Sequence, residues 1–149
     1  MRAVVQRVST AQVMVDGAVV ARIGAGLLVY LAVGGDDESP DMEYVVDKVR
    51  HLRVFADQAG KLNVDVVGAG GEVLAVSAFT VYADARKGRR PCLDAAATAE
   101  KARELFERFC ETLSGRGVPV RQGMFGAKMQ VESVNSGPIC LLLDSKRGF

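Results

Sequence analysis

Apolar and polar residues alternate along the first part of the chain, in AVVQRV at 3–8 and in AQVMV at 11–15. Alternation with a period of two is typical of strands that bury one face. Asp16-Gly17 follows, a dipeptide that suits the positive φ angles of a tight hairpin, and AVVARI at 18–23 returns to the strand pattern. The pattern therefore predicts antiparallel strands joined by a hairpin turn.

Later segments predict further strands. The unbroken apolar run from Leu27 to Val33 is typical of a strand that is buried on both faces, and EVLAVS at 72–77 predicts another strand. Three short strands are expected near the end of the chain, at 118–121, 129–134 and 139–144. The chain is therefore rich in strands.

Apolar residues at helical spacing predict two helices. Ser39 before Pro40 is typical of a helix start, so the first helix is expected from Pro40 to about Leu52. Asp94 is interpreted as the cap of a second helix, which Gly115 ends. The apolar stripe of this second helix consists of Ala102, Leu105, Phe106, Phe109, Cys110 and Leu113.

The order of these elements predicts an α+β fold, in which largely antiparallel sheets form a barrel-like or two-sheet core flanked by helices. This arrangement is favoured over a doubly wound parallel sheet. A length of 149 residues with 49% hydrophobic residues fits a single domain over residues 1–149. The run at 27–33 is too short to span a bilayer, and the N-terminus lacks the apolar core of a secretory signal, so no membrane association is expected.

The charge balance excludes binding of nucleic acid through a global positive field, because 19 Lys and Arg are balanced by 18 Asp and Glu. One local cluster stands out in ARKGRRP, where Arg86, Lys87, Arg89 and Arg90 surround Gly88. Such a loop is able to hold phosphates through its charge and through close approach of the backbone. The alternative interpretation is an ordinary solvated loop.

Residues of the usual catalytic kinds are few. The only histidine, His51, falls inside the first predicted helix, and the sequence patterns of common hydrolases and of P-loops are absent. The spacing of Cys92, Cys110 and Cys140 is not that of a metal site, and we interpret them as small hydrophobic residues of a cytoplasmic protein. We expect no metal and no cofactor, so catalysis would have to rely on backbone groups or on the substrate.

Two segments carry the remaining candidate chemistry. VSAFTVY at 76–82 ends a predicted strand with hydroxyl and amide groups that are able to form an oxyanion pocket, although Ser and Thr in strands usually pair with their neighbours. VNSGPICLLL at 134–143 interrupts a strand with Gly137 and Pro138. This pair marks either a bulge or an X-Pro bond in the cis form.

Several motifs follow one another over essentially the whole chain: MRAVVQRV at 1–8, LRVF at 52–55 with KLN at 61–63, VSAFT at 76–80, KGRRP at 87–91, GMFGAKM at 123–129 and VNSGP at 134–138. Together they resemble the D-aminoacyl-tRNA deacylase family. The resemblance implies hydrolysis of the ester that links a D-amino acid, or glycine, to the terminal adenosine of tRNA. It also implies a homodimer whose two active sites lie at the subunit interface.

The resemblance further implies how the site selects its substrate. Gly137 and Pro138 are expected to form a cis peptide that enters the pocket of the partner subunit, where carbonyl oxygens exclude the side chain of an L-amino acid. Arg7 is expected to hold this motif in place. Rejection by a clash and an unpaired polar group would act on chirality whatever the side chain.

The expected catalytic residues are Ser77, Phe79 and Thr80, with backbone N–H groups near Phe79 and Thr80 facing the scissile carbonyl. The expected substrate contacts also include Ala78, Phe125 and Met129, and the expected tRNA contacts are Arg86, Lys87, Arg89 and Arg90. Because no general base is implied, the 2′-hydroxyl of the terminal ribose would assist the attacking water.

Two positions depart from the family pattern, which usually has glutamine at Ala78 and threonine at Cys140. Neither departure touches the backbone groups of the expected mechanism, so we predict that activity is retained. Two alternatives remain open at this point. One is a module that binds the end of tRNA without catalysis, and the other is an editing enzyme with a different amino-acid preference.

Overall fold

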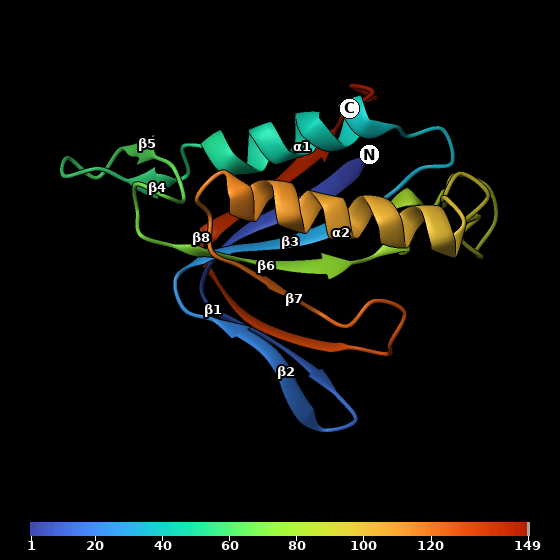
Figure 1. Ribbon diagram of the computed structural model, residues 1–149, viewed down its shortest axis with the longest axis horizontal. Coiled ribbons are helices and arrows are strands. Elements are labelled where there is room, and N and C mark those ends of the chain that lie inside the picture. Colours follow the sequence, from blue (N-terminus) through green and yellow to red (C-terminus); the bar gives the residue numbers. More distant parts are fainter. Residues whose placement is uncertain (149) are drawn as a thin grey trace.

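The computed structural model describes residues 1–148, and Figure 1 shows how its elements are arranged. The strands are β1 (Arg2–Val15), β2 (Ala18–Ile23), β3 (Gly26–Ala32), β4 (Phe55–Ala56), β5 (Leu62–Val64), β6 (Glu72–Ser77), β7 (Val120–Gln122) and β8 (Gln130–Asp144). The helices are α1 (Ser39–His51), the short 3₁₀ helix η1 (Phe79–Tyr82) and α2 (Ala99–Gly115).

The main sheet is mixed and centred on β1. This strand pairs antiparallel with β2, β3 and β8, whereas β3, β6 and β7 run parallel to one another. β4 and β5 form a separate two-stranded sheet that projects at one end of the molecule (Figure 1). The main sheet is nearly closed into a barrel, and α1 and α2 lie side by side on one side of it (Figure 1). The predicted α+β fold with a barrel-like core is confirmed.

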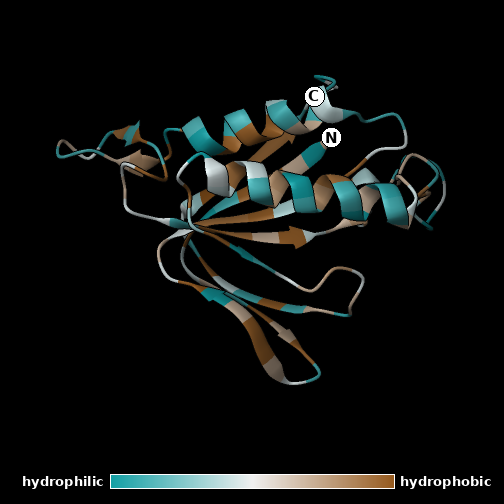
Figure 2. Cartoon of the chain, viewed as in Figure 1, coloured by the Kyte–Doolittle hydropathy of each residue, from teal (hydrophilic) through white to brown (hydrophobic). Residues whose placement is uncertain are grey.

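Two hydrophobic cores lie on opposite faces of β3 and β6. Odd-numbered residues of both strands, such as Val29 and Val73, pack under the helices. The even-numbered Leu28, Leu74 and Val76 fill a second core inside the curved sheet. Because successive side chains of a strand point to opposite faces, two cores require strands that are apolar throughout, and Figure 2 shows these strands in the colours of hydrophobic residues.

The predicted hairpin joins β1 to β2. Asp16 and Gly17 have φ angles of 50° and 79°, so both central residues of the turn are left-handed. That backbone is the one a two-residue hairpin of the favoured type requires, and Asp-Gly adopts it at low cost. The prediction from the dipeptide is confirmed.

The predicted cap of α1 lies one residue too late in the chain. The N-cap is Glu38, whose amide donates to the Asp41 carboxylate over 2.9 Å. The Ser39 hydroxyl is inside the helix and accepts a hydrogen bond from Arg108 of α2 over 3.0 Å. This serine therefore joins the two helices and does not cap the first one.

The predicted cap of α2 is wrong, because the helix begins at Ala99 with Thr98 as its cap. The residues from 95 to 97 are held against the loop that follows β3. Gly35 donates from its amide to the Ala95 carbonyl over 3.0 Å, and Ala97 donates to the Val33 carbonyl over 2.9 Å. These bonds to a distant segment keep the backbone after Asp94 out of the helix.

Candidate active site

The three parallel strands end at a common edge of the sheet. Ser77 at the end of β6 pairs with Leu31 of β3, and the amide of Gly123, just after β7, donates to the Ala75 carbonyl of β6 over 2.9 Å. Ligand sites of sheets with parallel strands commonly form at the carboxyl ends of these strands. We call this region the carboxyl edge; it consists of residues 77–82 after β6 and 123–129 after β7.

The turn after β6 presents two backbone amides. The Ala78 amide donates to the Leu31 carbonyl over 2.8 Å, and η1 begins at the next residue. The first amides of a helix have no partner within it, and within residues 1–148 those of Phe79 and Thr80 donate to no protein acceptor. Two consecutive free N–H groups beside an exposed surface are suited to bind an oxyanion.

The hydroxyl groups of Ser77 and Thr80 lie at the same turn but have no activating base. In the part of the chain that the structure describes, neither hydroxyl takes part in a side-chain hydrogen bond. His51 lies at the end of α1, exposed, with Nδ1 3.1 Å from the Asp47 carboxylate. A serine or threonine without a paired base is a weak nucleophile, so the free backbone amides are the groups of this turn best suited to chemistry.

A buried network anchors η1. The Tyr82 hydroxyl donates to the Asp37 carboxylate over 3.2 Å, and the same carboxylate accepts the Gly34 amide and the amino group of Met1. Asp37 is fully buried and receives a hydrogen bond on each of its oxygens. Burial, together with the negative charge of Asp37, raises the pKa of Tyr82 well above its usual range, so this hydroxyl stays protonated and keeps donating.

The 123–129 loop places two more predicted residues at the carboxyl edge. Phe125 packs on Phe106 of α2, with 6.0 Å between the ring centroids, and is partly buried against the first core. Met129 packs against the second core, and its sulfur lies where a side chain at position 123 would otherwise stand. Phe125 and Met129 therefore lie on the same edge as Ser77, Ala78, Phe79 and Thr80.

The predicted basic loop is closed by a backbone bridge, because Asp84 and Cys92 exchange two hydrogen bonds of 2.8 and 2.9 Å. Asp84 also accepts hydrogen bonds from the guanidinium of Arg86, which lower the pKa of Asp84 to about 2. The charge of Arg86 is thus largely paired within the loop. Lys87, Arg89 and Arg90 are exposed and have no partner among residues 1–148.

The Gly-Pro segment of β8 bulges out opposite a single residue of β1. Gln6 pairs with Cys140 and Val8 pairs with Asn135, so Arg7 alone stands opposite the four residues from 136 to 139. Asn135 closes this segment through hydrogen bonds of 3.0 and 3.3 Å with the amide and carbonyl of Ile139. The peptide bond between Gly137 and Pro138 is cis, so the segment is both a bulge and a cis X-Pro site.

Arg7 of β1 supports this segment through its guanidinium group. Its Nε donates to the Ser136 carbonyl over 3.0 Å, and its Nη1 donates to the Val54 carbonyl over 2.6 Å. Gly137 and Pro138 are exposed, and neither pairs with β1. The two carbonyl groups of this pair are therefore presented to the outside on a support fixed by Arg7 and Asn135.

The structure does not bring the two halves of the predicted site together within one chain. Arg7 stands beside Leu27, near the start of β3, and Leu27 pairs with Val73 near the start of β6. Ser77 lies four residues further along β6, which is about 13 Å at the usual rise of a strand. The Gly-Pro segment and the carboxyl edge thus lie at opposite ends of the same strands.

β8 carries exposed apolar side chains. β8 pairs only with β1 among the described strands, so its other edge is open. Val134 and Leu142 on this strand are 58% and 60% exposed, and Cys140 is exposed as well. A long edge strand with exposed apolar side chains is a surface that proteins normally cover.

Sequence reasoning missed three residues that position the site. Asn135 stands two residues before Gly137, and an Asn side chain that forms hydrogen bonds with the backbone a few residues further on is a known turn signal. Asp84 was a recognisable partner for Arg86 two residues away. Asp37 had no such signal, because its partners Tyr82, Gly34 and Met1 are brought to it only by the fold.

The described residues contain neither a membrane-spanning helix nor a cluster of metal ligands. None of the described helices is long and apolar enough to cross a membrane. Within residues 1–148, no three His, Cys, Asp or Glu side chains are grouped as they would be around a metal ion. Of the cysteines, Cys110 is buried and Cys92 and Cys140 are exposed, so the interpretation of cysteines as buried hydrophobic residues holds for Cys110 alone.

The chain is similar to known proteins over nearly its whole length. Residues 4–144 match the family model described as D-Tyr-tRNA(Tyr) deacylase. The chain is 51% identical to the D-aminoacyl-tRNA deacylase of Koribacter versatilis and 53% identical to that of Anaeromyxobacter dehalogenans, in each case over 149 residues and 100% of both chains.

Solved structures show the same fold. The chain superposes on the c-Myc DNA unwinding element binding protein with a TM-score of 0.93 and 37% identity, covering 97% of this chain and 98% of the other. A probable eukaryotic D-amino acid tRNA deacylase gives a TM-score of 0.82 at 18% identity, with 96% and 98% of the two chains covered. The second comparison bears on the fold alone.

Proposed function

The chain belongs to the D-aminoacyl-tRNA deacylase family, hydrolases that act on the ester bond of aminoacyl-tRNA, and from this premise we propose how its own residues carry out and restrict that reaction. The products are a free D-amino acid and tRNA. The observation that carries the proposal is the pair of free amides at Phe79 and Thr80, at the edge of the sheet that also holds Ala78, Phe125 and Met129.

The reaction needs only water and groups that are already aligned. Water attacks the carbonyl carbon of the ester, and the 2′-hydroxyl of the terminal ribose assists as a relay: it accepts the proton that water loses and passes its own proton to the neighbouring 3′-oxygen. The amides of Phe79 and Thr80 stabilise the negative charge that develops on the carbonyl oxygen. When the bond to the ribose 3′-oxygen breaks, that oxygen leaves with the proton relayed by the 2′-hydroxyl, so no protein acid or base is needed. The hydroxyls of Ser77 and Thr80 support the arrangement without acting as nucleophiles.

Chirality is selected by the carbonyl oxygens of the segment at Gly137 and Pro138. This role is supported by their exposure, by the absence of ladder pairing at these two residues, and by the hydrogen bond from Arg7 to the preceding carbonyl. The side chain of an L-amino acid would meet these oxygens and leave them without a partner, which costs free energy. Glycine has no side chain to reject, so glycyl-tRNA is also a substrate.

A second copy of the chain completes each site. The Gly-Pro segment and the carboxyl edge lie at opposite ends of β3 and β6. The Gly-Pro segment of one chain therefore cannot reach an ester bound at the Phe79 and Thr80 amides of the same chain. A two-fold dimer solves this, because each segment is then delivered to the partner's edge and both sites are equivalent. The open edge of β8, with Val134 and Leu142 exposed, provides a surface for this contact.

The tRNA is held beside the site by the basic loop. Lys87, Arg89 and Arg90 supply unpaired positive charges next to η1, while Arg86 is the least available because Asp84 holds it. Such contacts to phosphate give affinity without reading the sequence of the tRNA. The reaction belongs in the cytoplasm, where charged tRNA is used.

The function is tested by hydrolysis of matched substrates. D-tyrosyl-tRNA and L-tyrosyl-tRNA are incubated with catalytic amounts of the protein, and the release of tyrosine is followed. We expect rapid hydrolysis of the D-ester, hydrolysis of glycyl-tRNA, and no acceleration for the L-ester. Binding of tRNA without turnover would contradict the proposal and favour a binding module, and preferential hydrolysis of the L-ester would favour a different editing enzyme.

A further inference from the structure

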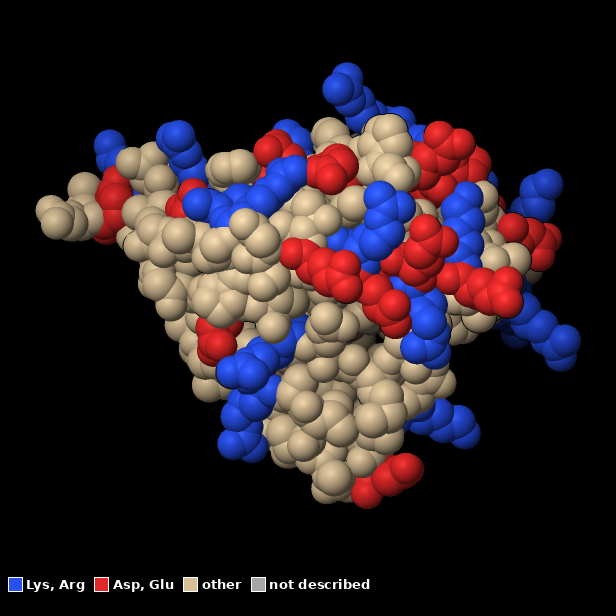
Figure 3. All heavy atoms as spheres, in the orientation of Figure 1, with Lys and Arg blue, Asp and Glu red and all other residues tan. Residues whose placement is uncertain are grey.

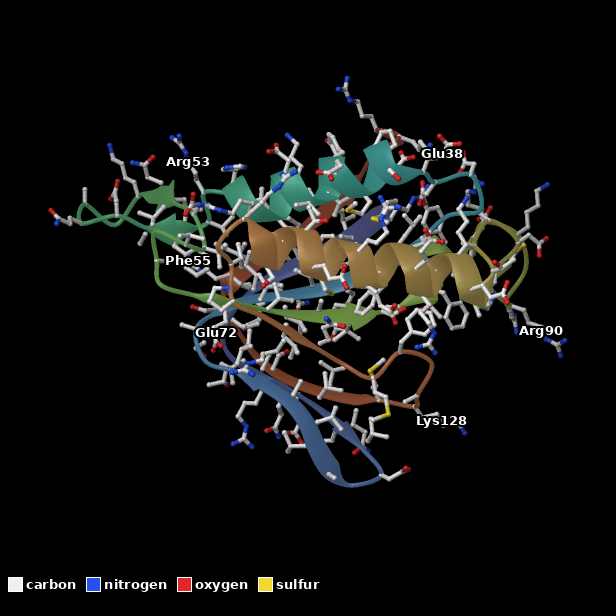
Figure 4. The ribbon with its side chains drawn as sticks, in the orientation of Figure 1. Glu38, Arg53, Phe55, Glu72, Arg90 and Lys128 are labelled. Atoms are coloured by element: carbon white, nitrogen blue, oxygen red, sulfur yellow. The ribbon has the colours of Figure 1, made fainter. Side chains whose placement is uncertain are left out.

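Basic residues that the proposed function does not use lie at the carboxyl edge, on the side away from the basic loop. Lys128 is in the 123–129 loop after β7, exposed, and without a partner among the described residues. Figure 4 labels Lys128 and Arg90, and both project from the same end of the long axis of the molecule. In Figure 3 blue side chains at this end border a surface that carries no charge.

Arg103 of α2 belongs to the same side as Lys128. Its guanidinium carbon lies 4.6 Å from the centroid of the Phe125 ring, so the cation covers the outer face of a predicted substrate contact. The nearest carboxylate, that of Glu107, is 3.7 Å away and exposed, which makes their ion pair weak. Arg103 therefore keeps most of its capacity to bind another anion while the ring fixes its position.

The surface at this edge also offers exposed apolar side chains. Phe79 is 54% exposed and Met124 is 47% exposed, one from η1 and the other from the 123–129 loop. Large apolar side chains exposed beside free cations are what proteins use to hold a single strand of nucleic acid, with bases stacked on apolar faces and phosphates on Lys and Arg. A folded duplex would not need the apolar component.

There is also room for a nucleotide between η1 and the basic loop. A pocket of about 460 Å³ lies there, and its lining includes Tyr82, Asp84 and Arg86. This volume is within the range of small-molecule sites. The carboxyl edge thus has cations on two sides, apolar groups at its surface and a pocket next to it.

We infer that Lys128 and Arg103 form the second half of a two-sided phosphate contact, which holds the single-stranded 3′ end of the substrate between them and the basic loop. The inference rests on the proposed function and assigns its substrate contacts. Lys128 contacts a phosphate upstream of the terminal nucleoside, and Arg103 positions the strand through Phe125. Neither residue touches the reacting ester.

The test compares a substrate that has upstream phosphates with one that has none. D-tyrosyl-tRNA and the D-tyrosyl ester of adenosine are hydrolysed by wild type, Lys128→Ala and Lys128→Glu. Lys48→Ala and Lys48→Glu are matched controls, because Lys48 is an exposed lysine on α1, near the Tyr44 ring. Each variant is measured from about 50 to 200 mM salt.

We expect Lys128→Ala to lower kcat/KM for the tRNA about threefold or more and Lys128→Glu to lower it further, with a salt slope about one unit smaller. Hydrolysis of the adenosine ester stays at the wild-type rate, and the Lys48 variants match wild type on both substrates. Equal losses on both substrates, or no loss on the tRNA, would overturn the inference.

The same variants separate this inference from the proposed function. If wild type hydrolyses neither ester, the proposed function fails, and the affinity for uncharged tRNA is then measured by filter binding. Weaker binding by Lys128→Glu but not by Lys48→Glu would still support the phosphate contact. Equal binding by all of these proteins would overturn it.

Discussion

Arg7 of β1 donates through Nε to the carbonyl oxygen of Ser136 on β8, over 3.0 Å, and among the described residues this is the only side-chain hydrogen bond from β1 to the four-residue bulge. The same guanidinium reaches the Val54 carbonyl, so it joins three separate segments of the chain. A planar group with several fixed donors is suited to such a junction. The exposed Gly-Pro pair takes its position from this junction.

Arg7→Lys tests the junction. Lysine keeps the charge but has no planar fork, so one of the two carbonyls, at Ser136 or at Val54, loses its donor. We expect kcat/KM for D-tyrosyl-tRNA to fall about tenfold or more, and the free energy of unfolding to fall by about 1–3 kcal/mol. Steady-state kinetics and urea unfolding measure the two effects.

Arg22→Lys is the matched control for Arg7→Lys, because the side chain of Arg22 is exposed and, among the described residues, donates only to the side chain of Gln12. We expect this variant to keep its activity and its stability within about 0.5 kcal/mol. Wild-type activity in Arg7→Lys would show that the Gly-Pro segment needs no support from β1.

Gly137→Ala tests the shape of the segment itself. Gly137 has a φ of 136°, and an added Cβ would lie 2.9 Å from both the amide nitrogen and a side-chain carbon of Ile139. The backbone has to shift, at a cost of about 1–3 kcal/mol, and the shift moves the carbonyls that we propose to face the substrate. We expect a fall in kcat/KM of about tenfold or more, measured on D-tyrosyl-tRNA. Gly24→Ala, at a glycine with nothing within 4 Å of the added atom, should leave activity unchanged.

Phe79→Pro tests the oxyanion site. Proline is tolerated at the first position of a helix, so η1 is kept while one of its two free amides is removed. We expect kcat to fall about a hundredfold or more. Phe79→Ala removes the ring but keeps the amide and should lose much less. Equal values of kcat for the two variants would mean that the amide takes no part in the reaction.

Asp37→Asn tests the network that anchors η1. The substitution leaves the buried amino group of Met1 without its charged partner, and breaking a buried pair costs about 3–5 kcal/mol. Urea unfolding should show this loss, whereas Asp36→Asn, at an exposed neighbour, should change stability by less than about 0.5 kcal/mol. Similar small effects in both variants would show that the network adds little to the fold.

The sequence predicts these helices and strands because the spacing of apolar residues within each segment is enough to identify its type. The apolar stripe from Leu105 to Leu113 repeats at the spacing of a helix, and the run EVLAVS at 72–77 is typical of a strand. Both elements form where predicted. The predicted cap of α2 was wrong because residues 95–97 bond to Val33 and Gly35, which lie about sixty positions earlier in the chain. No pattern near Asp94 indicates that contact.

The Gly-Pro pair shows the same limit at the site. The sequence allowed a bulge or a cis bond, and the structure contains both. That Arg7 stands opposite the bulge follows from the register between β1 and β8, which depends on long-range pairing. The separation of the segment from the carboxyl edge follows from the same register, so no single motif indicates the distance that led us to propose a second chain.

The most direct test of a site shared between two chains is complementation between Gly137→Ala and Phe79→Pro. The first variant keeps the amides of η1 and the second keeps the Gly-Pro segment, so a mixed dimer has one site in which both halves are intact. After unfolding and refolding together, we expect the mixture to recover up to about a quarter of wild-type activity on D-tyrosyl-tRNA. Activity no higher than the average of the two variants alone would contradict a site completed by the partner subunit.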